Sequence, residues 1–141
     1  MSEKQKEFSF WVPGIPRSKQ RARTLKSGRS YTPKITADYE KKVALCFLQK
    51  YKKGDKFTGP VHLDLAITMP ILKKWSHDKQ EAMRGYPHTN RPDLGNIQKA
   101  IEDALNGFAY IDDSQISRIT EYKIWGRVVG IQVTITEDKQ G

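Results

Sequence analysis

The segment 91–99 and two aspartates that follow it hold the side chains best suited to chemistry. Asp93 opens a predicted helix, and Lys99 lies on that helix. Asp112 and Asp113 follow after a short connection. Carboxylates can hold a divalent cation, and a lysine can neutralise charge on a phosphoryl group. Because phosphodiester hydrolysis needs both, the sequence indicates metal-dependent cleavage of nucleic acid, with the three aspartates at the metal and the lysine at the phosphate.

Each of these residues also has a simpler interpretation. Asp93 alone is more often just the N-cap of its helix. Asp112 and Asp113 are typical of a turn. On the predicted helix Asn96, Lys99 and Asp103 follow at spacings of three and four and therefore share one exposed face. A salt bridge between Lys99 and Asp103 there is worth only a few tenths of a kcal/mol, unless Asp103 serves to support the lysine.

The charge of the chain points to a polyanionic partner. Lysines and arginines number 25 against 16 acidic residues in 141, a formal net charge of +9. The segment 17–34 contains seven lysines and arginines and no Asp or Glu, which favours a functional basic arm over scattered surface charge. Such an arm would grip phosphates without reading sequence. The residues expected to do so are Arg17, Lys19, Arg21, Arg23, Lys26 and Arg29.

Several classes of protein are excluded by composition. No apolar run approaches the ~20 residues of a membrane helix, so no membrane partner is expected. The single cysteine, Cys46, cannot form an internal disulfide, which fits a reducing cytoplasm. One cysteine and three scattered histidines also make a structural zinc site improbable.

The pattern of apolar residues predicts a single domain over residues 1–141, of the α/β or α+β class. The expected order is strand, helix, strand, helix, strand, strand, which gives a mixed four-stranded sheet with helices packed on it. The elements expected are a strand at 7–12, a loop at 17–33, a helix from a Thr36 cap to Lys53, a strand at 61–69, a short helix from Ser76 to Met83, a helix at 94–105, a hairpin of strands 115–125 and 127–136, and a frayed tail at 137–141.

Together, these residues resemble the RusA family of Holliday junction resolvases of bacteria and their phages. The likeness extends over almost the whole chain and is carried by VPGIPRSKQRAR, YTPKITADYEKKV and above all HTNRPDLGNIQKAIEDALNG with YIDDSQI. The family signature is Asp-x-Asp-Asn-x-x-Lys, then Asp-x-Leu, then Asp-Asp. The resemblance implies that Asp93, Lys99 and Asp113 are catalytic, with Asp112 also at the metal. It implies supporting roles for Asn96, Asp103 and Lys123.

The resemblance also implies an activity. Family members are homodimers that cut four-way DNA junctions with Mg²⁺, with Mn²⁺ as the alternative ion, and nick two strands of like polarity. The expected function is therefore resolution of Holliday junctions and other branched DNA in recombination and repair, by a cytoplasmic protein of bacterial or phage origin. Two-fold symmetry in the protein suits a substrate that presents paired strands.

One signature position departs from the pattern, because Gly95 stands where the family has its second aspartate. The site loses a carboxylate, so metal affinity should fall and incision with it. Gly95 could be an introduced inactivating change, a natural variant that binds metal through the remaining carboxylates, or the mark of a member that binds branched DNA without cutting it. An RNA-binding or ribonucleolytic domain with the same basic surface is a further, weaker alternative.

Overall fold

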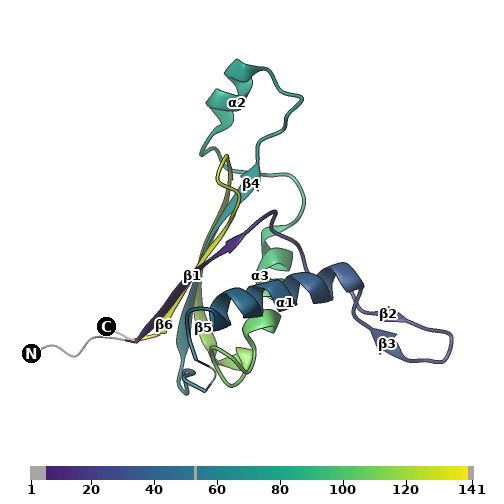
Figure 1. Cartoon of the computed structure of the whole chain (residues 1–141), viewed down its shortest axis with the longest axis vertical. Coiled ribbons are helices and arrows are strands. Elements are labelled where there is room, and N and C mark those ends of the chain that lie inside the picture. The colour runs from purple at the N-terminus through teal and green to yellow at the C-terminus, as the bar shows by residue number, and fades with distance from the viewer. Residues whose placement is uncertain (1–5, 53, 140–141) are drawn as a thin grey trace, which may run out of the picture.

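The computed structural model describes residues 6–52 and 54–139, which form a mixed four-stranded sheet with helices on one face (Figure 1). The strand order is β1-β6-β4-β5, and a two-stranded hairpin, β2-β3, lies apart from the sheet. In chain order the elements are β1 (Glu7–Pro13), β2 (Arg23–Thr24), β3 (Ser30–Tyr31), α1 (Lys34–Leu48), β4 (Val61–Pro70), α2 (His77–Met83), α3 (Leu94–Leu105), a 3-10 turn (Asp113–Gln115), β5 (Ile116–Gly126) and β6 (Gly130–Glu137). The predicted α+β fold is confirmed.

The two central strands, β4 and β6, carry alternating apolar and polar residues. Every second residue of β4 from Val61 to Met69 is buried, and β6 buries Ile131, Val133 and Ile135 in the same way. Because successive side chains of a strand point to opposite faces, these residues all meet the helices. β6 pairs antiparallel with both β1 and β4, whereas β5 pairs parallel with β4. β5 is therefore an edge strand.

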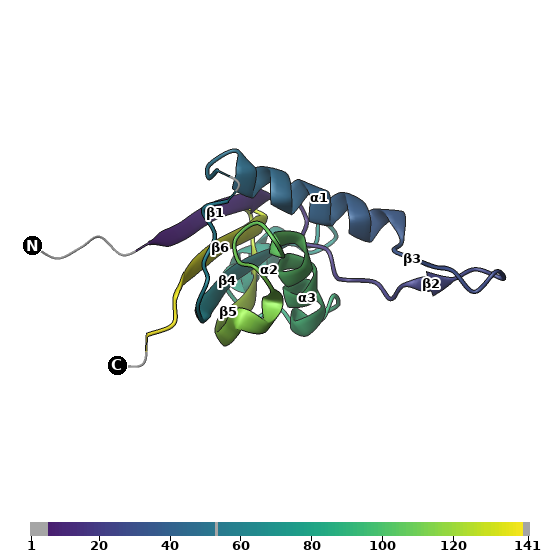
Figure 2. The ribbon, with the colours of Figure 1, turned by 90° about the horizontal axis from the view of Figure 1, so that it is seen from below.

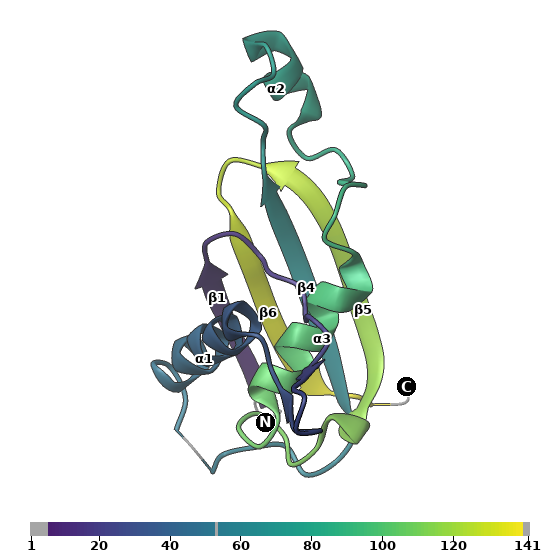
Figure 3. The ribbon, with the colours of Figure 1, turned by 90° about the vertical axis from the view of Figure 1, so that its right-hand side faces the viewer.

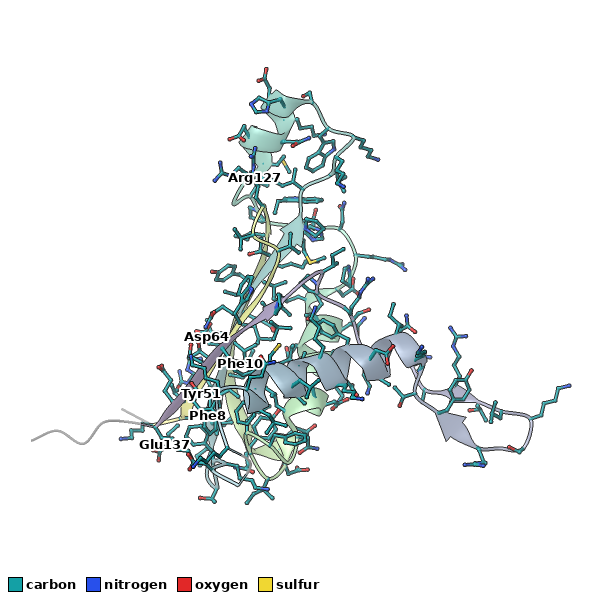
Figure 4. All side chains as sticks on the ribbon, in the orientation of Figure 1. Phe8, Phe10, Tyr51, Asp64, Arg127 and Glu137 are labelled. Atoms are coloured by element: carbon teal, nitrogen blue, oxygen red, sulfur yellow. The ribbon has the colours of Figure 1, made fainter. Side chains whose placement is uncertain are left out.

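Helices α1 and α3 lie side by side over one face of the sheet (Figures 2 and 3). α3 buries Ile97, Ala100, Ile101, Ala104 and Leu105 against the sheet, whereas Leu94 in its first turn is only partly buried. From α1, the wholly buried ring of Phe47 meets the rings of Phe8 and Phe10 edge-on, at centroid distances of 5.0 and 5.7 Å. Figure 4 shows Phe8, Phe10 and Tyr51 gathered between the sheet and α1. This packing fixes α3, and with it the residues of the site.

Among the described residues, no helix covers the other face of the sheet (Figure 1). Asp64 alternates with the buried Leu63 and Leu65 and therefore points to this face (Figure 4). Gln132 donates a hydrogen bond to the Ser9 hydroxyl at 2.8 Å across two strands. The candidate site is accordingly on the helix side of the sheet.

The predicted hairpin of strands 115–125 and 127–136 is wrong. Both strands exist as β5 and β6, but β4 lies between them and they do not pair with each other. Strands next to each other in sequence pair in only about two-thirds of cases. Here β6 is apolar on its inner face and takes a central place, whereas β5 buries only Trp125 and takes the edge. The segment 127–129 therefore passes across the end of β4.

The basic segment 17–33, expected to be a loop, contains the hairpin β2-β3, which projects from the body beside the start of α1 (Figure 1). Arg23 pairs with Tyr31, and Thr24 with Ser30. At the tip Gly28 has φ +88°, a conformation that favours glycine, and its N–H donates to the Leu25 carbonyl at 2.9 Å. We call residues 21–31 the basic arm.

Helix α1 differs from the prediction at both ends. It begins at Lys34 behind Pro33, and Thr36 does not cap it. Thr36 is buried in the first turn, where its hydroxyl accepts a hydrogen bond from the Gln20 N–H at 3.1 Å. The helix ends at Leu48, before the predicted end at residue 53, which lies outside the described residues. Tyr51 follows the helix, and its hydroxyl bonds the backbone of β1.

The short helix α2 forms as predicted. Ser76 caps it by accepting a hydrogen bond from the Lys79 N–H at 3.2 Å. α2 stands at the far end of β4, well away from the basic arm (Figure 1). Of the predicted frayed tail, residues 140–141 lie outside the described residues, whereas Asp138 is held by the side chains of Ser117 and Arg118. Within the described ranges, no helix has the length and apolar character needed to span a membrane.

Candidate functional site at the start of α3

The first turn of α3 presents Asp93 to solvent. Asp93 stands at the N-cap position, where a short carboxylate commonly accepts a backbone hydrogen bond, but its side chain makes no such bond. Its carbonyl accepts the first hydrogen bonds of the helix, from the N–H groups of Asn96 and Ile97, both at 3.1 Å. The simple interpretation of Asp93 as a capping side chain is thus not supported. Its carboxylate is exposed beside the partial positive charge of the helix start.

Lys99 is the cation at the middle of the site. Its ammonium lies 3.4 Å from the Asp103 carboxylate and 3.7 Å from that of Asp113. The Asp103 charge is the main reason that the pKa of Lys99 is raised above its ordinary value. The structure therefore brings Lys99 and Asp113 together, although 13 positions separate them in the sequence and the ion pair with Asp103 was the simpler expectation.

Asp112 and Asp113 have different surroundings. The Asp112 carboxylate accepts a hydrogen bond from the Ser114 N–H at 3.0 Å. Hydrogen bonding to the Ser114 side chain, and then to this N–H, holds the pKa of Asp112 below its usual value. Gln115 completes a capping box, because its side-chain oxygen accepts from the Asp112 N–H at 3.0 Å. Asp112 thus shapes the turn, while Asp113, on the same turn, faces Lys99. The predicted turn is therefore present, and the functional role of Asp113 stays a prediction.

Lys19 is engaged within the protein. Its ammonium lies 2.7 Å from Glu40 and 3.2 Å from Asp103, and so joins the N-terminal segment to α1 and α3. Burial works against the charge of Lys19, but its hydrogen bonds to Glu40 and Asp103 outweigh this and raise its pKa. Lys19 was assigned above to phosphate binding, and its contacts suit a positioning role better. No pattern in the sequence pointed to Glu40 as the partner of Lys19.

Lys123 reaches the site from β5. Its ammonium donates to the backbone carbonyls of Asn90 and Pro92, both at 2.6 Å, and so anchors the segment that leads into Asp93. Burial lowers the pKa of Lys123, and the nearby Asp93 opposes that shift. Lys123 was expected only as a supporting residue, and these contacts show how it would support Asp93.

A carboxylate that the sequence did not single out lies behind the site. Glu121 points inward from β5, because its register partner in β4 is the buried Leu65. One of its oxygens is buried without a hydrogen-bond partner among the described residues. Burial, followed by the charge of Glu102, raises the pKa of Glu121. Only the pairing of β5 with β4 reveals this residue, and that pairing was not predicted.

Gly95 has no structural reason to be glycine. It lies in the first turn of α3, does not have a positive φ, and a Cβ added there would meet no atom within 4 Å. Residues three and four apart on a helix are neighbours, so a side chain at position 95 would lie beside Gln98 and Lys99. The backbone can accept the family's aspartate without rearrangement.

The acidic residues do not amount to a complete metal site. Over residues 6–52 and 54–139, no three His, Cys, Asp or Glu side chains are grouped closely enough to hold an ion. Asp93 and Lys99 are separated by about 9 Å along the helix axis, at 1.5 Å per residue. The oxygen donors nonetheless fit Mg²⁺, which commonly uses one or two carboxylates and completes its shell with water and substrate phosphate.

The basic arm, the mixed sheet and the exposed carboxylates of α3 together define a protein built to act on a polyanion. A family model described as Endodeoxyribonuclease RusA matches residues 13–136. The chain therefore belongs to the RusA family of endodeoxyribonucleases, nucleases that act on branched DNA. It is also 30% identical over 137 residues to the uncharacterized protein YqaN of Bacillus subtilis (strain 168), a match that covers 92% of this chain and 96% of that protein.

Proposed function

We propose that this chain is a structure-selective endodeoxyribonuclease that resolves Holliday junctions and other branched DNA by Mg²⁺-dependent hydrolysis. The observation that carries the proposal is the contact of Lys99, in the middle of α3, with Asp113, in a chain of the RusA family. Two copies acting together would place two such sites on a four-way junction. The proposal includes a homodimer, a bacterial or phage origin and a role in recombination and repair.

Each residue of the site has a distinct role in this proposal. Asp93, Asp112 and Asp113 would hold the cation, which when bound supplies a nucleophilic hydroxide and neutralises phosphate charge. Lys99 stabilises the charge that grows on the phosphoryl oxygens as the bond to the leaving oxygen breaks. Asp103 orients Lys99, and Lys123 holds the backbone before Asp93 in place.

The direct test is an incision assay on a synthetic four-way junction with Mg²⁺, using linear duplex of the same sequence as control. We expect paired nicks in strands of like polarity on the junction and none on the duplex. Sedimentation of the protein–junction complex gives the number of copies bound. If neither this chain nor Gly95→Asp cuts while both are folded and bind as dimers, the nuclease proposal is wrong.

Gly95 favours a second candidate, a protein that binds branched DNA without cutting it. The remaining carboxylates are then too few to hold the cation at working concentrations. Tight and salt-sensitive junction binding, with no incision across Mg²⁺ and Mn²⁺, would support this candidate. Structured RNA added as a competitor tests whether the chain is instead an RNA-binding protein. The RNA should displace junction DNA from an RNA-binding protein, but not from a junction nuclease or a junction-binding protein.

The basic arm should contribute phosphate contacts. Arg23, Lys26 and Arg29 are exposed and form no ion pair among the residues that the structure describes. The association constant for DNA falls as salt concentration rises, by about 0.9 in the slope of log K against log salt concentration for each phosphate contact. We expect joint replacement of the three residues by alanine to make this slope shallower by about 2.7. The loss should be similar for all sequences, because phosphates carry no sequence information. Titrations at several salt concentrations measure it.

The charge-matched control replaces three exposed lysines at the other end of the molecule, Lys73, Lys74 and Lys79. Both variants lose three positive charges, so the general field of the protein falls equally. An equal change of slope in both variants would mean that the arm makes no contacts of its own.

A further inference from the structure

A pocket of about 540 Å³ opens beside Asp93, between the segment 15–20 and the start of α3. Its volume falls within the range of small-ligand sites and exceeds the need of one nucleobase. Its walls are mixed in character. Apolar surface comes from Ile35, Met69 and Pro92, and polar groups come from Arg17, Gln20 and Asn96.

Both walls of the pocket are tied to the rest of the fold. On one side the Lys19 N–H donates to the Asn96 carbonyl at 2.8 Å, and the Gln20 N–H donates to the Thr36 hydroxyl at 3.1 Å. On the other side Lys123 holds the carbonyl of Pro92 at 2.6 Å. Little ordering would therefore be needed when a ligand enters, and a preformed site loses less free energy on binding.

The pocket continues away from Asp93 into a second hollow of about 360 Å³. The two share Ile15, Arg17 and Ile35, and the second extends to Lys42 on α1. Arg17 thus stands where the two meet. The walls of this path are mixed, with cations at Arg17 and Lys42 and one carboxylate, Asp38, in the second hollow. Apolar surface for bases and cations for phosphates together fit a single strand of nucleic acid.

We propose that this pocket takes up one unstacked nucleotide of the DNA strand, next to the phosphate presented to Asp93. The inference rests on the proposed function. The base would lie against Ile35 and Pro92, and the side-chain amides of Gln20 and Asn96 each offer a donor and an acceptor to its edge. Unstacking costs least where pairing is already disturbed. The pocket would therefore favour branch points over duplex, and would discriminate among bases at the cut.

The experiment places 2-aminopurine at successive positions around the branch point of a synthetic four-way junction, in EDTA so that nothing is cut. Its fluorescence rises when the base leaves the stack. We expect a rise at one or two positions on binding of the unmodified chain. Ile35→Trp, which fills the pocket, should abolish that rise and weaken binding by about tenfold, the loss of one base contact.

Leu45→Trp is the matched control. Leu45 is exposed on the same helix, does not line the pocket, and should leave the rise intact. If Ile35→Trp does not fold, as judged by circular dichroism, Gln20→Tyr blocks the pocket from the opposite wall. Binding without a rise at any position, or a rise that survives the blocking variants, overturns the pocket inference and leaves the nuclease proposal standing. Failure to bind junctions at all overturns both.

Discussion

Gly95→Asp is expected to raise the rate of junction incision by about 100-fold or more, which corresponds to ~2.7 kcal/mol at 1.36 kcal/mol per factor of ten. The added carboxylate supplies an oxygen donor one helical turn from Lys99, whose ammonium already contacts Asp113. Lewis-acid stabilisation by a bound cation is worth several kcal/mol, so a more fully occupied site should have a large effect. Single-turnover incision across a Mg²⁺ titration measures both the rate and the half-saturating concentration, which should fall.

Gly95→Asn is the matched control, because it has nearly the same shape and no charge. Both side chains enter open space, and neither requires a positive φ. Asp at this position should also stabilise the helix by a few tenths of a kcal/mol to ~1 kcal/mol, since it replaces glycine and complements the helix dipole. Equal incision by the Asp and Asn variants would show that the missing charge is not what limits the reaction.

The sheet and helices could largely be predicted because their signals are local. Apolar residues alternate with polar ones from Val61 to Met69 and recur at helical spacing from Ile97 to Leu105. Each pattern predicts which face of its element is buried. The order of the strands is not local. β5 and β6 are joined by a short connection typical of a hairpin, yet the burial of β6 on its inner face decides the outcome and places β4 between them.

The contacts of the site are also partly local in sequence and partly dependent on packing between elements. The spacing of Lys99 and Asp103 on one helix is enough to predict their ion pair, which the structure confirms at 3.4 Å. The contacts of Lys19 with Glu40, and of Lys123 with the carbonyls before Asp93, depend on how separate elements pack. Nothing in the sequence ranks Lys19 apart from its basic neighbours. Only the packed structure shows which lysines make contacts within the protein and which remain exposed to solvent.

Lys99→Gln is expected to reduce incision by about 10²–10³-fold, the loss usual for removing one group that stabilises the transition state. Its effect on the free energy of unfolding should be below ~0.5 kcal/mol, because a half-exposed pair at i, i+4 contributes little. The two readouts separate the catalytic interpretation of Lys99 from the structural one. Incision is measured in single turnover, in the Gly95→Asp background if the unmodified chain is slow, and stability by urea unfolding.

Lys41→Gln removes the same charge from an exposed position on α1 and should change neither quantity. Lys99→Arg should restore part of the rate, since it keeps the positive charge but not the compact ammonium. If Lys99→Gln lowers the incision rate no more than Lys41→Gln does, Lys99 only forms a surface ion pair with Asp103. Positive charge at the phosphate would then have to come from another residue, and Arg17 and Arg91, which line the same pocket as Asp93, are placed to supply it.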